Sequence, residues 1–242
     1  MTTRHIEGRD GIEKYLNDTN RAKRRLATRL ATAAGDWREA YGEIALPNVD
    51  LRQQTYGLLS LVREPSSDEK DALKERGIKF LPVTSISYAQ VVAADTAYFR
   101  DRQLEYANAR PELRGYVLPV AVEIGLRHSP ELALSSSFGK PQETQLRMID
   151  EYSQELQKQF PDVRAIMLPS TGYAQVDRAY KAETGEVLFR VYYARALDNF
   201  SGGYAVHVGR YDPSHPLSVN EWLADDGHHN VVAVPAVVFL RK

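Results

Sequence analysis

Apolar and polar positions follow one another along the chain with periods that predict helices and strands in turn. In residues 10–34, apolar side chains recur every three or four positions, which predicts an N-terminal helix with one apolar face that ends near Gly35. The sequence Ser66-Ser67-Asp68-Glu69 is typical of a capping box, so it predicts a helix that starts there and ends near Gly77. Further helices are expected over residues 87–99, 141–160 and 173–184, and a short one from a second capping box at Ser218.

Short apolar runs that are rich in β-branched residues and bounded by turn residues predict the strands. A buried strand is expected at residues 78–83 and another at 163–168, each directly before a helix. Because helices and strands alternate there, we expect parallel neighbours in the middle of the sheet and antiparallel strands near the strand-rich C-terminal end. The other expected strands cover residues 42–46, 55–62, 116–126, 186–196, 204–208 and 231–240.

Two stretches of the chain resemble one another in order and spacing. Residues 80–91 contain Leu-Pro and then Tyr-Ala-Gln-Val, and both return in residues 167–176, after 87 and 85 positions. Phe99-Arg100 likewise recurs as Phe189-Arg190. Matches in the same order favour an internal duplication, although two unrelated strand–loop–helix units with similar capping residues would give a similar pattern.

These patterns together predict an α/β fold, with a mixed sheet built from two related strand–helix–strand modules and preceded by the N-terminal helix. We assign residues 1–63 to the basic helix and short strands, and residues 64–138 to the first module. Residues 139–242 then form the second module and the C-terminal strand. The two modules are expected to pack as one domain.

Composition limits the classes of protein to which this chain can belong. An apolar fraction of 43% with 26% charged residues is typical of a folded globular protein. The absence of cysteine excludes disulfides, thiolate catalysis and iron–sulfur ligation, and it fits a reducing compartment. Residues 1–20 contain no apolar signal region, and the longest apolar run, residues 231–240, is interrupted by Pro235. We therefore expect a cytoplasmic protein with no membrane segment.

Charge is distributed unevenly along the chain, although the net charge is only −1. Residues 1–38 hold nine Lys or Arg against five Asp or Glu, so the predicted N-terminal helix is basic. Its residues 14–29 are a candidate contact for nucleic-acid phosphates or a protein partner, because arginines four positions apart share one face of a helix. The alternative is a solvated helix paired with the acidic remainder of the chain. The arginines of this surface are Arg21, Arg24, Arg25 and Arg29.

The loops that follow the two resembling strands are the best candidates for a ligand site. Each opens a helix, so its backbone N–H groups and the helix dipole favour an anion, and ligands of open α/β sheets bind outside the carboxyl ends of strands. The alternative is structural, because Ser and Thr are common N-caps and the tyrosines fit a core with one polar end. The loops lack the glycine pattern of a phosphate-binding loop. The candidate residues are Thr84, Ser85, Ser87, Tyr88 and Gln90 in the first loop and Ser170, Thr171, Tyr173 and Gln175 in the second.

Other chemistries have weaker support in the sequence. Gly139-Lys140 before a helix resembles part of a phosphate loop, but Pro141 as a first helical residue explains it without a ligand. No serine lies in a nucleophile elbow. His207 is the histidine to watch for a Ser–His–Asp set formed in space, but a lone histidine on a strand is more often a hydrogen-bonded structural residue. No metal site is predicted, because adjacent histidines in a strand point to opposite faces and no metal-binding motif is present. The residues considered for metal binding are Asp212, His215, Asp225, Asp226, His228 and His229.

The sequence therefore favours a non-catalytic binding or assembly protein, which contacts a partner or a small anionic ligand through the paired loops. One alternative is an enzyme that acts on a phosphorylated or nucleotide-like substrate at the same loops. Another is a nucleic-acid-associated protein that uses the basic N-terminal helix. No cofactor is indicated, and a homo-oligomer remains open.

Overall fold

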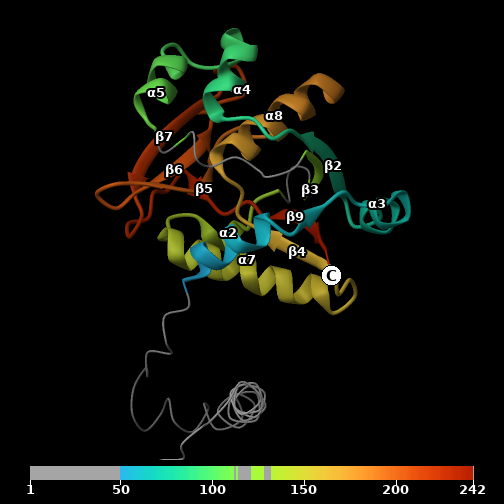
Figure 1. Ribbon diagram of the computed structural model, residues 1–242. Coiled ribbons are helices and arrows are strands. Elements are labelled where there is room, and N and C mark those ends of the chain that lie inside the picture. Colours follow the sequence, from blue (N-terminus) through green and yellow to red (C-terminus); the bar gives the residue numbers. More distant parts are fainter. Residues whose placement is uncertain (1–49, 112, 114–120, 128–131, 242) are drawn as a thin grey trace, which may run out of the picture. The chain divides into compact units, whose positions relative to one another are not determined.

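Two β-sheets and six α-helices make up the part of the chain that the computed structural model describes, residues 50–111, 113, 121–127 and 132–241 (Figure 1). The predicted helix over residues 10–34, its arginines and the strand at 42–46 lie outside the described residues. The described residues belong to one unit that runs from Asp50 to Lys242. The fold is mixed α/β, as the sequence predicts.

The first sheet has five strands, and every pair in it is antiparallel. Its central strand is β9, which pairs with β1, β3 and β4, while β2 pairs with β3. The prediction of parallel neighbours is therefore wrong for these strands, because the C-terminal strand inserts between β3 and β4 and runs opposite to both. The strands are β1 (Val62–Arg63), β2 (Ile78–Val83), β3 (Val122–Arg127), β4 (Val163–Ile166) and β9 (Ala236–Leu240).

The second sheet has four strands in the order β7-β6-β5-β8, and it is mixed and curled into a half-barrel. Its β5–β8 pair is parallel, and the other pairs are antiparallel. The turn between β5 and β6 holds Gly202 and Gly203, which have φ angles of 84° and 81° that favour glycine. The strands are β5 (Tyr193–Phe200), β6 (Tyr204–Gly209), β7 (Ser218–Leu223) and β8 (Val231–Val232).

The helices cover the sheets and join them. Helix α8 contacts β2 of the first sheet and both β5 and β6 of the second, and it also contacts α4 (Figure 1). Helix α7 packs against β4 and α2, and α3 packs against β2. The helices are α2 (Leu51–Leu59), α3 (Ser67–Lys74), α4 (Tyr88–Ala94), α5 (Gln103–Ala109), α7 (Gln142–Gln157) and α8 (Ser170–Thr184), with 3-10 turns at Thr96–Tyr98 and Ser135–Ser137.

Several predicted elements are confirmed. Ser66 caps α3 through the complete capping box, with Glu69 closing it. Strand β2 spans residues 78–83 as predicted, and α8 starts three residues before the predicted Tyr173. Local signals of this kind are reliable where an apolar face or a cap belongs to the element itself.

Other predicted elements are wrong, and in each case a tertiary contact explains the difference. Residues 55–59 form the second half of α2 instead of a strand, since Asp50 caps that helix and Thr55 and Leu59 share its buried side, and only Val62 of the predicted strand lies in β1. Residues 218–223 form β7 instead of a helix, because pairing with β6 satisfies their backbone groups and buries Val219. The strand expected over residues 186–196 begins only at Tyr193.

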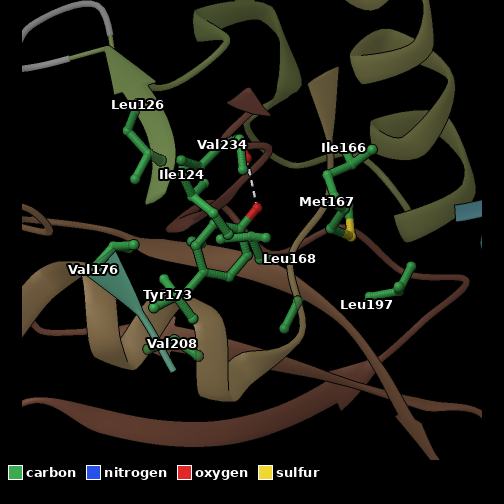
Figure 2. Close-up of a cluster of buried hydrophobic side chains, with 14 of the residues drawn as sticks. Ile124, Leu126, Ile166, Met167, Leu168, Tyr173, Val176, Leu197, Val208 and Val234 are labelled. Atoms are coloured by element: carbon green, nitrogen blue, oxygen red, sulfur yellow. Dashed lines mark hydrogen bonds between the residues drawn. The ribbon is translucent and has the colours of Figure 1, made fainter. Parts of the chain in front are cut away.

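The core between the sheets is centred on Tyr173 of α8 (Figure 2). Its hydroxyl donates a hydrogen bond of 2.5 Å to the carbonyl oxygen of Val234, which lies next to β9. Around it lie apolar side chains of both sheets, among them Ile124 of β3 and Val208 of β6. One continuous apolar cluster therefore contains residues of both sheets.

The structure does not confirm the predicted internal duplication. The rings of Tyr88 and Tyr173 each lie edge-on to the ring of a downstream phenylalanine, Phe99 and Phe189 respectively. The ring centroids are 5.9 Å apart in both pairs, which fits a repeat. However, Tyr88 is the first residue of α4 whereas Tyr173 is the fourth of α8. Strands β2 and β4, which precede these helices, also run in opposite directions within the first sheet. The duplication stays a prediction.

Candidate functional site

The two loops predicted to bind a ligand lie against each other in the structure. The side-chain oxygen of Gln175 accepts hydrogen bonds from the backbone N–H of Thr84 at 2.8 Å and from its hydroxyl at 2.7 Å. The amide nitrogen of Gln175 donates to the Thr84 carbonyl at 3.0 Å. Thr171 donates from its hydroxyl to the Ile86 carbonyl at 2.9 Å. These groups therefore hold residues 84–87 against α8, and their hydrogen bonds are used within the chain.

Ser87 and Gln90 serve as a cap in the first loop. The Ser87 hydroxyl accepts from the Gln90 N–H at 3.4 Å, and the Gln90 side-chain oxygen accepts from the Ser87 N–H at 2.8 Å. This reciprocal pair is a capping box that starts α4. Ser85 and Gln90 are exposed. The capping alternative that the sequence offered accounts for Ser87 and Gln90.

Tyr88 and Tyr173 are core residues in the structure. The Tyr88 hydroxyl donates to the side-chain oxygen of Gln103 at 2.8 Å, and both tyrosine side chains are 0% exposed. Burial raises the pKa of both hydroxyls above the ordinary value of tyrosine. Their polar ends bind protein groups, so neither hydroxyl is directed at a ligand that arrives from solvent.

The start of α8 already holds a carboxyl group from the chain itself. The backbone N–H of Ser170, the first residue of α8, donates to Asp198 Oδ2 at 2.6 Å, and both residues are buried. Burial raises the pKa of the Asp198 carboxyl to about 7, against the lowering effect of its hydrogen bonds with Ser170. The carboxyl group of Asp198, from β5, thus occupies the helix N-terminus at which a ligand was expected.

A groove lies beside the paired loops, along α8. Its volume is about 570 Å³, which is within the range of small-molecule sites. Arg178 and Lys181 of α8 both line it, and the acidic side chain of Asp95 lies opposite, 3.8 Å from Arg178 Nη2. The lining residues are Pro82, Asp95, Tyr98, Gln175, Arg178, Ala179, Lys181 and Ala182.

Lys181 contributes a cation to the groove that no carboxylate of the described residues pairs with. Its ammonium lies 5.0 Å from the centre of the Tyr98 ring, which is a cation–π contact. The Tyr98 ring also lines the groove. A positive charge next to an aromatic face is therefore open to a ligand in the groove.

A buried ion pair between Asp177 and Arg210 holds the Tyr98 hydroxyl in place. The Tyr98 hydroxyl donates to Asp177 Oδ2 at 2.6 Å, and Arg210 Nη2 donates to the same oxygen at 2.5 Å. The other Asp177 oxygen accepts from the N–H groups of Leu188 and Phe189. Burial, and then the charge of Asp177, raise the pKa of Tyr98 above its ordinary value. The hydroxyl therefore stays protonated at neutral pH and keeps its place in this network.

Sequence reasoning placed one groove residue, Gln175, among its candidates and missed the two cations. A signal for them was present, because Gln175, Arg178 and Lys181 are spaced by three positions on a helix that the sequence predicts. Asp95 and Tyr98 had no such signal, since only the packing of α4 against α8 brings them to the groove.

The remaining sequence candidates do not gather into a further site. Among the described residues no group of three His, Asp or Glu side chains is arranged to hold a metal ion. The rings of His228 and His229 stack at 4.6 Å, and His215 contacts Asp212 at 2.5 Å on the surface. Pro141 precedes α7 as its N-cap residue instead of its first helical residue. Within the described part of the chain, no helix is long and apolar enough to cross a bilayer.

Comparisons with protein-family models, with curated protein sequences and with solved structures found no match. The function is therefore inferred from the geometry of the chain.

Proposed function

We propose that the protein binds a small anionic ligand in the groove beside α8, as a non-catalytic binding protein. The observation that carries this proposal is the pair of cations, Arg178 and Lys181, on the wall of one 570 Å³ groove with Asp95 as the opposing charge. Gln175 reaches the same groove from the paired loops. The proposed site therefore lies on the surface next to the paired loops, whereas the sequence predicted it at the loops themselves.

The chemistry of the groove favours a phosphate group attached to a flat ring. The guanidinium of Arg178 offers several donors in one plane, and Lys181 offers a compact charge. The Tyr98 ring, which is held in place through Asp177, adds an aromatic surface to the groove next to Lys181. A groove of this volume falls in the range of small-molecule sites. A nucleoside monophosphate has both features.

Thermal stability in the presence of inorganic phosphate and of a nucleoside monophosphate tests the proposal. Both should raise the melting temperature of the full chain, because a ligand that binds only the folded state stabilises it. Lys181→Gln and Arg178→Gln should each weaken binding roughly tenfold, the effect of losing a hydrogen bond to a charged group.

Lys158→Gln is the matched control, since it removes the same charge from an exposed position on the surface. It should leave the affinity unchanged at fixed ionic strength. An absence of stabilisation by either probe, or equal losses in the control and the two groove variants, would rule out this function.

A further inference from the structure

A second candidate site for an anion lies on the second sheet, around Arg195. Arg195 of β5 is fully buried, with 0% of its side chain exposed. Its Nε donates to Gln145 Oε1 at 3.2 Å, and its Nη2 donates to the carbonyl oxygen of Asp226 at 3.3 Å. Its Nη1 is buried and has no acceptor among the described residues. Both acceptors are neutral groups, an amide and a peptide carbonyl.

Arg210 shows how the same protein neutralises a buried arginine. It is 1% exposed, and Asp177, which is 0% exposed, accepts its Nη2 at 2.5 Å. Arg210 also has two N–H groups without acceptors, Nε and Nη1, so the number of hydrogen bonds does not distinguish the two arginines. The difference is the carboxylate, because no carboxylate of the described residues forms an ion pair with Arg195.

The charge of Arg195 persists at neutral pH. Burial lowers the pKa of its guanidinium to about 10, and the exposed carboxylate of Asp226 acts in the opposite direction. Each buried charge without a counter-ion destabilises a fold by roughly several kcal/mol. A site that keeps such a charge is therefore suited to an anion that comes from outside the chain.

His207 adds a second orphaned polar atom next to Arg195. The two residues face each other across the β5–β6 pair, and His207 is 8% exposed. Its Nδ1 is buried and has no hydrogen-bond partner among the described residues, while its ring contacts Tyr193 edge-on at 5.0 Å. Burial, and then the charge of Arg195, lower the pKa of His207 to about 3, so the ring is neutral at neutral pH.

One turn of chain, residues 224–230, covers this pair. Its Asp226 carbonyl binds Arg195, and its Ala224 carbonyl accepts from the Gln142 N–H at 2.8 Å. Gly227 packs so closely against the Gly139 carbonyl that a Cβ would overlap it. The backbone hydrogen bonds that join this turn to the β5–β6 pair lie at its two ends, from the Ala224 N–H to the Gly203 carbonyl at 2.7 Å and from the Tyr193 N–H to the Asn230 carbonyl at 2.8 Å. Displacement of the residues between these ends, 225–229, would therefore uncover Arg195 without breaking the sheet.

We propose that Arg195 and His207 form a second binding site, for a small carboxylate that enters when residues 225–229 move away. A guanidinium matches the two oxygens of a carboxylate in one plane. One monovalent anion balances the single charge of the site, whereas a phosphate dianion leaves excess negative charge in a buried place. His207 then contacts the ligand through its free ring nitrogen. The site is separate from the groove beside α8, because its residues lie on β5 and β6 and it takes another class of anion.

Nuclear magnetic resonance of the full chain with ¹⁵N-labelled arginine tests this site, with formate and acetate as probes. The Nε–H signal of Arg195 should shift in a saturable way with either probe and remain in place with chloride at equal ionic strength. Arg195→Met identifies the signal by its loss, and it should weaken carboxylate binding roughly 10- to 100-fold, as expected for hydrogen bonds to a charged group. The shift should persist unchanged in Lys181→Gln, which separates this site from the groove.

His207→Asn provides a second variant that keeps Arg195 and its signal. It should weaken carboxylate binding roughly 2- to 10-fold, as expected for a neutral hydrogen bond. An Arg195 signal that does not move with formate or acetate would overturn the proposal, and so would a shift that is lost in Lys181→Gln but retained in His207→Asn. Should Arg195→Met fail to fold, the wild-type and His207→Asn titrations still decide the question.

Discussion

Three buried ionisable groups of the second sheet and its neighbours differ in how their charge is compensated. Asp177 pairs with Arg210 as an ion pair. Among the described residues Asp198 has no cationic partner, and it keeps its proton to a higher pH, because burial raises the pKa of its carboxyl to about 7. Arg195 has neither a carboxylate partner in the described part of the chain nor a pKa near neutrality. Each of these situations has its own consequence for stability.

The two buried arginines should respond differently to the same substitution. Arg210→Met leaves the buried carboxylate of Asp177 without its partner, which should lower the free energy of unfolding by about 3–5 kcal/mol. Arg195→Met removes a charge that no carboxylate of the described residues pairs with, so it should lower the free energy of unfolding distinctly less. Urea unfolding of both variants without added carboxylate measures the difference. Equal destabilisation would mean that the charge of Arg195 is compensated as fully as the charge of Arg210.

Asp198 should make stability fall as pH rises. The folded protein keeps the Asp198 proton up to about pH 7, whereas an unfolded aspartate releases it near pH 4 (about 3.9). Between these values the folded state binds more protons than the unfolded state, so the free energy of unfolding decreases with increasing pH. Asp198→Asn removes this contribution and leaves an oxygen that accepts from Ser170.

The measurement is urea unfolding of both proteins between pH 4 and pH 8. The stability of the asparagine variant relative to wild type should increase from about pH 4 to about pH 7 and then level off. His207 contributes an opposite slope at acidic pH in both proteins, because its lowered pKa favours the folded state as pH rises. A difference between the two proteins that does not change with pH would contradict the assignment of Asp198.

At the scale of elements, Gln175 joins the loop after β2 to helix α8. Its side chain binds both the backbone and the hydroxyl of Thr84, and it is 8% exposed. The sequence placed Gln175 and Gln90 in equivalent positions of a repeat, yet Gln90 closes a local capping box at an exposed helix start. Gln175 thus links two elements, whereas Gln90 stabilises the start of a single helix.

Gln175→Leu should therefore destabilise the protein more than Gln90→Leu does. The first change leaves the Thr84 N–H and carbonyl without partners in a partly buried place, at a cost of about 1–3 kcal/mol. The second weakens one cap, which costs about 0.5–1 kcal/mol or less. Thermal unfolding of both variants compares them. Equal effects would show that the contact between the loop and α8 contributes no more than a cap.

At the scale of the whole described unit, two chain segments hold the sheets in one core. Helix α8 contacts strands of both sheets, and Tyr173 bonds to Val234 at the start of the segment that becomes β9. Strand β9 comes last in the chain and occupies the centre of the first sheet. This sheet is thus completed only when the C-terminal residues pair, which joins segments far apart in sequence.

The sequence alone determined the elements that carry their own signals. The capping box at Ser66, the buried strand at residues 78–83 and the amphipathic pattern of α7 depend on neighbours a few positions away, and the structure has them. Of the candidate site, the sequence supplied Gln175 and the helix on which Arg178 and Lys181 lie.

Tertiary structure decided what distant segments do to one another. It made residues 218–223 a strand, because pairing with β6 satisfies more backbone groups than a one-turn cap does. It placed β9 between β3 and β4, and it left Arg195 buried beside His207 with no carboxylate of residues 50–241, as far as these are described, paired to it. Strand partners and counter-ions are chosen by long-range packing and by the cost of burying charge, and neither quantity is a property of a local stretch of sequence.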